Sequence, residues 1–288
     1  VAIKSSVQTA DVIALGDTGN TNDNLNVGQH ELNRIFATTL TIGTTQAASV
    51  VLDDDAYLYT LGGSIGTLAV ETTGNFTLAA ADDITSAGGN ISLTVGDLVM
   101  NASDGIVTTG AVTLSVDASG NDMVLGNGSG GDTSANNIVV DDTEMALITA
   151  TTANFGSTIT DIINVSALST ADLLNIESVT LAATLDEGTI AFTGASLFGA
   201  LSASADTQID VGGALTVTRG ALTLDGNADN ADNTGADIID IGADITSSGG
   251  GLITLDATTG GITLTADITI TTSTGGGGVT FTDSINAA

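Results

Sequence analysis

The sequence predicts an all-β chain that is wound into a parallel β-helix, and three observations support this prediction. A short phrase of two apolar residues around a threonine recurs along the chain, often after glycine. This alternation puts the apolar pair on one face of a strand and the threonine on the other, and glycine suits the corner before it. The chain has no proline, which favours strands paired on both sides because proline cannot donate to a ladder. The phrase also recurs at short intervals, as it does in solenoid proteins.

The phrase is most regular between residues 249 and 281. There Ile253-Thr254-Leu255, Ile262-Thr263-Leu264 and Val279-Thr280-Phe281 follow one another. Earlier copies lie at residues 76–78, 91–93, 112–114, 179–181, 215–217 and 222–224. The intervals cluster near about ten or about twenty residues, which indicates several strands per coil. At about twenty residues per coil and ~4.8 Å between strands, we expect ~14 coils and a rod of ~65 to 70 Å.

The first part of the chain alternates apolar clusters with a polar excursion. Residues 1–3 and 12–15 are apolar, and residues 16–24 form a loop of Asp, Asn, Thr and Gly. Such residues tolerate left-handed backbone and cap their own main chain, so we expect the loop at the surface.

The rest of the chain reads as coils with loop excursions. Residues 66–125 are the cleanest run of repeats, and a loop rich in Gly, Asn and Ser follows at 126–137. We expect that loop to leave one corner of a coil. The repeat becomes irregular between residues 138 and 209. Within this stretch, residues 171–175 predict a single helical turn. Strict repeats return after residue 209 and are interrupted by an Asp/Asn-rich loop at 225–235.

The composition predicts a buried core inside an acidic exterior. The chain has 34 acidic residues and three Lys plus Arg, for a formal net charge of -31, yet its mean hydropathy is positive at +0.37. A disordered acidic tail would combine high charge with low hydropathy, so that class is excluded. Nucleic acid is excluded as a partner because phosphate binding needs clustered cations, and Lys4, Arg34 and Arg219 are scattered. No apolar run reaches the ~20 residues of a membrane helix, which predicts no membrane insertion.

The residue inventory predicts no catalytic site. The chain has no cysteine for a thiolate nucleophile, His30 is its only histidine, and it contains no Gly-x-Ser-x-Gly string. Its many acidic corners do supply carboxylate pairs, which glycosidases use. A polysaccharide-active β-helix enzyme is therefore an alternative. Polysaccharide lyases, however, use Lys or Arg near an acidic sugar, and three scattered cations do not favour that chemistry.

One loop has the oxygen-rich pattern of a calcium site. Asp225, Asn227, Asp229 and Asp232 are separated by one or two residues, and Ca²⁺ binds several oxygen ligands of this kind. The loop lacks the later bidentate glutamate of an EF-hand, so a hydrated Asp/Asn turn is the alternative. Calcium is the one cofactor that the sequence suggests.

Several strings resemble known bacterial exoproteins. Residues 29–43, in which Glu31-Leu32 precedes Thr39-Leu40-Thr41-Ile42-Gly43, resemble a repeated element of filamentous-haemagglutinin-like exoproteins. Residues 261–268 are similar to the coil repeats of the same family. This resemblance implies a right-handed parallel β-helix that is exported as a long fibre. Residues 163–168 and 175–181 are similar to strings in calcium-dependent surface-layer proteins.

These features predict a non-enzymatic structural component of a secreted or cell-surface bacterial fibre: an adhesin stalk, a scaffold or a self-assembling filament subunit. Residues 1–288 are interpreted as one β-solenoid domain, either a segment of a longer protein or a unit of a filament. The reason is that no capping helix precedes Val1 and no polar cap follows Ile285.

The expected partners are other copies of the chain, end to end, and host or matrix surface ligands at the loops. We expect an extracellular or bacterial cell-surface location. The first alternative function is a calcium-dependent surface-layer or adhesion module, and the second is the polysaccharide-active enzyme.

Overall fold

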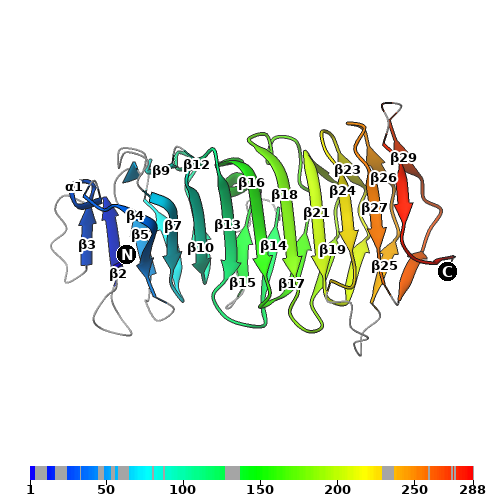
Figure 1. Cartoon of the computed structure of the whole chain (residues 1–288), viewed down its shortest axis with the longest axis horizontal. Helices are drawn as coiled ribbons and strands as arrows, with labels where there is room; N and C mark the ends of the chain where they lie inside the picture. The colour runs from blue at the N-terminus through cyan, green and yellow to red at the C-terminus, as the bar shows by residue number, and fades with distance from the viewer. Residues whose placement is uncertain are drawn as a thin grey trace.

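The chain folds as a parallel β-helix. A computed structural model describes residues 1–3, 12–16, 25–32, 34–44, 49–52, 56–57, 65–79, 81–86, 88–126, 137–228, 237–258, 260–273, 275 and 277–287. Every strand pair among these residues is parallel. The strands lie side by side in rows, and the chain runs from one end of the row to the other (Figure 1). The predicted fold class is therefore confirmed.

Four sheets make up the walls of the coil. The main sheet follows the order β1 (Ala2–Ile3), β4 (Ala37–Gly43), β7 (Ile65–Glu71), β10 (Asn90–Val95), β13 (Ala111–Val116), β16 (Ile148–Ser157), β18 (Ile176–Ala183), β21 (Ala200–Ala205), β24 (Leu222–Asp225), β27 (Ile253–Asp256), β30 (Val279–Phe281). Joined to it through β16 are β12 (Gly105–Thr108), β9 (Asp83–Ser86) and β6 (Ala56–Tyr57).

The other three sheets flank the main sheet. The second has the order β11 (Asp97–Val99), β8 (Asn75–Leu78), β5 (Ser49–Leu52), β2 (Val12–Gly16), β3 (Leu25–Gly28). The third has the order β15 (Asn137–Val140), β14 (Asn121–Leu125), β17 (Thr160–Val165), β19 (Thr189–Phe192), β22 (Gln208–Val211), β25 (Ile238–Ile241), β28 (Gly261–Leu264), β31 (Ile285–Ala287). The fourth has the order β20 (Ser196–Phe198), β23 (Leu215–Val217), β26 (Ile245–Ser247), β29 (Ile270–Thr272).

Apolar residues stack in register through the coils. We define the inner rank as the eleven main-sheet residues that pair in series: Ile3, Ile42, Val70, Leu93, Leu114, Phe155, Leu181, Ala203, Leu224, Leu255, Phe281. The nine residues between the two ends of this rank are at most 1% exposed. The alternation seen in the sequence thus places its apolar residues inside, as predicted.

The neighbouring outward positions hold mostly polar residues. We define the outer rank as the residues one position before the inner rank: Ala2, Thr41, Ala69, Ser92, Thr113, Asn154, Thr180, Ser202, Thr223, Thr254, Thr280. The Asn154 amide donates a hydrogen bond to Thr113 Oγ1 at 3.1 Å, which ties neighbouring coils together. Hydroxyl groups therefore lie on the exterior of the main sheet, also as predicted.

The coils are longer and fewer than the sequence spacing predicts. Ile3 and Phe281 lie ten coils apart in the inner rank, which is an average of about 28 residues per coil. A single coil step ranges from Ile91 to Val112 up to Val112 to Ala153. With eleven strands along the main sheet and ~4.8 Å between strands, the row is about 48 Å long. The estimate of ~14 coils was wrong because inserted strands and loops lengthen several coils.

Two strands fold back toward the N-terminal end and account for the longest coils. β3 follows β2 in the chain but pairs on its outer side, and β15 follows β14 and lies between β14 and β11. Each is followed by a short helix, α1 (Gln29–Leu32) or α2 (Asp142–Ala146). Residues 171–175 form a turn where a helical turn was predicted. The structure does not describe most of the predicted loops at 16–24, 126–137 and 225–235.

Several acidic side chains are buried, contrary to the expected wholly acidic exterior. They are Asp82, Asp97, Asp104, Glu144, Asp206 and Asp237. The physical reason is that corners interrupt the ladder and leave backbone N–H groups that need an acceptor. Asp104 accepts from the N–H of Ala81 at 2.8 Å, and Asp206 accepts from that of Glu187 at 2.9 Å.

Two glycines have similar backbone conformations but different surroundings. A comparison of substitutions at the two positions therefore distinguishes backbone strain from steric collision. Gly156 has φ +86° and Gly120 has φ +82°, a region that costs an L-residue about 1–2 kcal/mol. A Cβ at Gly156 would collide with the carbonyl oxygen of Ala182 on β18, whereas among the described residues nothing lies within 4 Å of a Cβ at Gly120. We expect Gly156→Ala to lower the free energy of unfolding by at least about 2 kcal/mol more than Gly120→Ala. Urea denaturation of both variants measures this, and equal losses would contradict it.

Candidate functional site

The apolar files of the coil end with solvent-exposed residues in the last described coil. β29, β30 and β31 are the last strands of their sheets. Phe281 ends the inner rank and is 37% exposed, although Leu255 below it is 0% exposed. Ile285 stacks on Ile262, which is 0% exposed, but is itself 46% exposed. Core-type side chains therefore meet solvent at this end.

At the N-terminal end, β1 and β3 are the terminal strands of their sheets among the described residues. β3 lies outermost at this end in Figure 1. The Val1 amino group donates to the Thr39 carbonyl oxygen at 2.9 Å and holds the first strand in place. Leu32 of α1 is 1% exposed, so the helix covers part of the core. His30, the only histidine, is exposed on the same helix.

Both ends carry little of the chain's negative charge. Residues 1–44 contain four acidic residues, Lys4 and Arg34, for a formal charge of -2 out of -31. Residues 261–288 contain two acidic residues, Asp267 and Asp283, and no Lys or Arg, which also makes -2. Low charge is not confined to the ends, because residues 188–224 contain only Asp206, Asp210 and Arg219 and carry a formal charge of -1.

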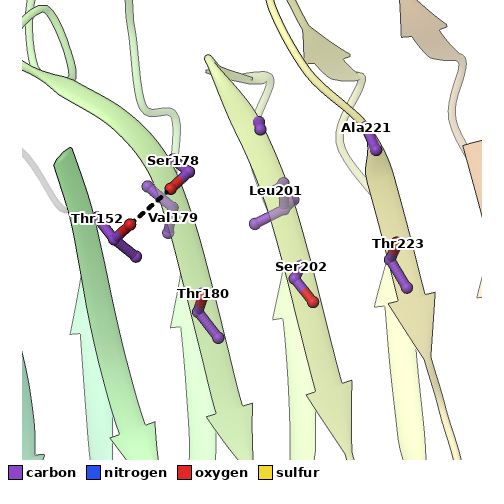
Figure 2. A pocket seen from close by; sticks show the side chains of 9 residues that line it. Thr152, Ser178, Val179, Thr180, Leu201, Ser202, Ala221 and Thr223 are labelled. Atoms are coloured by element: carbon purple, nitrogen blue, oxygen red, sulfur yellow. Dashed lines mark hydrogen bonds between the residues drawn. The ribbon is translucent and has the colours of Figure 1, made fainter. Parts of the chain in front are cut away.

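A shallow groove of about 350 Å³ lies on the outer face of the main sheet. Figure 2 shows its small side chains on β16, β18, β21 and β24, with a hydrogen bond of 3.0 Å between Thr152 Oγ1 and Ser178 Oγ. Its lining residues are Thr152, Ser178, Val179, Thr180, Ala200, Leu201, Ser202, Ala221 and Thr223. None of these is acidic, basic or aromatic, so they supply hydroxyl groups but no acid–base pair.

The structure describes half of the predicted calcium site. Asp225 ends β24 and accepts a hydrogen bond from the Asn227 backbone N–H at 3.2 Å. The Asn227 side chain is 1% exposed and donates to the carbonyl oxygen of Thr258 in the next coil. Asp229 and Asp232 lie outside the described residues. Within the part of the chain that the structure describes, no group of three or more His, Cys, Asp or Glu could hold a metal ion, and the calcium site stays a prediction.

Acidic residues pair between neighbouring coils. Asp210 is in register with Asp240, and Asp225 with Asp256. Burial raises the pKa of Asp210, and the Asp240 charge raises it further. Burial likewise raises the pKa of Asp225, with the Asp256 charge adding to it and the hydrogen bond from Asn227 opposing it. Glycosidases also use pairs of carboxyl groups, and the likeness to these stacked residues goes no further. That the chain has no catalytic activity stays a prediction.

A carboxyl group with a strongly raised pKa lies at the junction between the second and third sheets. Glu144 of α2 is 8% exposed and accepts from the Met100 N–H at 3.0 Å and from the Asp141 N–H at 3.2 Å. Asp141 in turn accepts from the Glu144 N–H at 2.9 Å, which completes a capping box. Burial raises the pKa of Glu144 to about 7, against the opposing effect of the two hydrogen bonds. A carboxyl group thus joins β11 to α2 where the ladder is interrupted.

The junction at Glu144 was not among the predictions made from the sequence. Glu144 looks like any surface acid in the sequence, but Asp141-x-x-Glu144 is a capping-box pattern that indicates a helix start.

Comparisons with known proteins place this chain in no family. No family model, no curated protein and no solved structure matches it. Among the described residues, no helix is long and apolar enough to cross a membrane.

Proposed function

We propose that this protein is a non-enzymatic structural component of a secreted or cell-surface bacterial fibre, in which copies stack end to end. The observation that carries the proposal is the uninterrupted stacking of the inner rank. Its nine residues between Ile3 and Phe281 are at most 1% exposed and pair in register through successive parallel coils. The edge of a parallel sheet can pair with a further strand, so such a ladder can be extended.

The uniform ladders support a mechanical role. Each coil contacts mainly the coils before and after it, so the stability of the rod is a sum of neighbouring terms and can continue through added coils. A contact between two different ends of one chain is heterologous, and such contacts produce open filaments when the rotation does not close a ring. Adhesive specificity would then belong to loops that leave the coil.

The test is the concentration dependence of assembly. We expect analytical ultracentrifugation of the wild type to show elongated species that grow with concentration, and electron microscopy to show fibres one rod wide. Substituting Phe281→Asp together with Ile285→Asp should weaken association by at least about tenfold, because burying each apolar side chain is worth about 1.5–3 kcal/mol.

Leu174→Asp is the matched control, since Leu174 is 64% exposed in a turn away from both ends. This variant should assemble like the wild type. Circular dichroism confirms that each variant keeps its strand content. A monomer at every concentration, or equal assembly of the end variant and the wild type, would refute the proposal.

A further inference from the structure

Two sheet edges meet in the wall of the rod without a strand ladder between them. β11 is an end strand of the second sheet, and β15 is an end strand of the third. The two strands lie side by side, but β11 pairs only with β8 and β15 only with β14 among the described residues. We call the contact between β11 and β15 the seam. Ladders join successive strands along the main sheet, so the seam is a place where the wall can part more readily.

Two carboxyl groups form hydrogen bonds across the seam. Glu144 of α2 accepts the Met100 N–H just after β11 at 3.0 Å, and Asp97 of β11 accepts the Val139 N–H of β15 at 3.4 Å. Both carboxyl groups are at most 9% exposed. Glu144 also accepts the Asp141 N–H at 3.2 Å, so one carboxyl group binds the start of α2 and the end of β11 together. Acidic side chains therefore hold the seam where a ladder is missing.

The charged side chains around Glu144 are all acidic in the part of the chain that the structure describes. Asp97 lies on β11, Asp104 lies in the turn that follows it, and Asp141 and Asp142 begin α2. The neighbouring strands β12, β15 and β16 contain no charged residue. Burial is the largest cause that raises the pKa of Glu144; its two hydrogen bonds oppose this rise, and the charges of Asp141 and Asp97 add to it. An ionised Glu144 would thus be a buried charge without a cation to balance it.

The chain contains a second example of this unit, 113 residues earlier. Residues 25–43 and 138–156 align without a gap, and seven of these nineteen positions are identical. The strand pairing is also the same, because β2 pairs with β3 as β14 pairs with β15. The identical pairs are Val27 and Val140, Glu31 and Glu144, Ile35 and Ile148, Ala37 and Ala150, Thr38 and Thr151, Thr39 and Thr152, Gly43 and Gly156.

The earlier unit closes its core without a buried carboxyl group. Glu31, the counterpart of Glu144, is exposed, and Gly28 stands in place of Asp141. Leu32 is nevertheless 1% exposed, much like its counterpart Met145 at 0%. A unit of this kind therefore folds whether or not its glutamate is buried. Glu144 serves the seam and is not required for the fold of the unit itself.

We propose that residues 137–147, which contain β15 and α2, form a pH-sensitive flap that is closed on β11 while Glu144 holds its proton and that opens locally when Glu144 ionises. In the open form water reaches the Glu144 carboxyl group, so the open form releases the proton at lower pH than the closed form does. Rising pH therefore favours opening. This inference goes beyond the proposed fibre and does not depend on whether copies of the chain assemble.

The open form is a minority at every pH in this range. Opening exposes Ile138, Val140 and Met145, which are at most 1% exposed in the closed form, and the loss of this apolar burial opposes it. The change with pH is thus a change in how often the flap opens, and the rest of the rod keeps its structure. Local openings of this kind are measured by hydrogen exchange of the native protein.

Two N–H groups report on the flap. The Met100 N–H is bound by Glu144, and the Met145 N–H donates to the Asp141 carbonyl oxygen at 2.9 Å. After correction for intrinsic exchange rates, both should be less protected than the Leu181 N–H of the main sheet. Because the pKa of Glu144 rises from 4.5 to about 7 in the closed form, their protection should fall roughly 70-fold between pH 5 and 8.

Matched variants assign the effect to Glu144. Glu144→Gln should reduce the fall in protection by about the same factor, whereas Glu31→Gln, the same change at the exposed counterpart, should leave it as in the wild type. Circular dichroism confirms that each variant keeps its strand content, and the wild-type series is informative without any variant. The inference is overturned if the Met145 N–H is as protected as that of Leu181 throughout, since the flap then opens only with the whole rod. It is equally overturned if Glu144→Gln loses as much protection with rising pH as the wild type.

Discussion

Phe192→Ala is expected to lower the free energy of unfolding by about 3–5 kcal/mol, the usual cost of emptying a large aromatic site in a packed core. Phe192 on β19 is 1% exposed, and its ring meets that of Phe198 on β20 edge to face, with centroids 6.3 Å apart and planes at 86°. The two residues lie on either side of a corner between the third and fourth sheets. Truncation removes both the buried area and the ring pair.

The solenoid architecture makes this loss hard to compensate. Ile163, Val165, Ile190, Ile209 and Val211 are held in register by ladders above and below, so they cannot move toward the cavity without breaking strand pairs. Guanidinium chloride denaturation followed by circular dichroism measures the change. Phe36→Ala is the control, because Phe36 is 72% exposed and its loss should cost no more than about 0.5 kcal/mol. A loss below about 1 kcal/mol at Phe192 would show that the coils adjust more freely than the ladders suggest.

The fold could be predicted because each coil repeats one local rule. Leu222-Thr223-Leu224 and Ile253-Thr254-Leu255 pair residue by residue, with apolar groups inside and threonine outside. Local alternation alone determines which side faces the core, since a slip of one residue would turn every apolar group outward. The fold class and the contents of the ranks therefore follow from the sequence.

The length of the rod could not be predicted in the same way, because spacing along the chain does not reveal which strands stack. β15 begins at residue 137 and pairs with β14, the strand that precedes it in the chain. The residues of this extra strand lengthen the coil, so the step from Val112 to Ala153 is the longest along the main sheet. The signal that was present is the 113-residue duplication, in which Ala37-Thr38-Thr39 returns as Ala150-Thr151-Thr152. A comparison of the chain with itself would have found both backward strands.

The candidate site was predictable in part. Asp225 and Asn227 were recognised by their type and spacing, and the structure places Asp225 at the end of β24, where it accepts a hydrogen bond from the Asn227 N–H. Burial of acidic residues was not predictable from composition, because a carboxylate at a corner serves as an acceptor for one particular N–H, as Asp206 does for Glu187. That pairing depends on which coils are neighbours, and composition does not contain this information.

Titration of Glu144 is expected to lower the stability of the protein as pH rises from 5 to 8. Its pKa is about 7 in the folded chain, raised from 4.5 by burial. The folded state therefore holds a proton that the unfolded state has released, so the contribution is full below the unfolded pKa and is lost as pH rises through the folded one. A shift of this size corresponds to about 3 kcal/mol.

Glu144→Gln removes this titration while keeping a carbonyl oxygen that can accept the Met100 N–H. We expect the free energy of unfolding of this variant to decline less between pH 5 and 8 than that of the wild type, by about 3 kcal/mol. Glu177→Gln, at an exposed position, should decline in parallel with the wild type. Because the comparison is between variants, the titration of other carboxyl groups cancels. Parallel curves for Glu144→Gln and the wild type would mean that Glu144 is ionised in the folded protein throughout this range. The carboxylate would then be stabilised at the junction by its two N–H donors more strongly than burial opposes it.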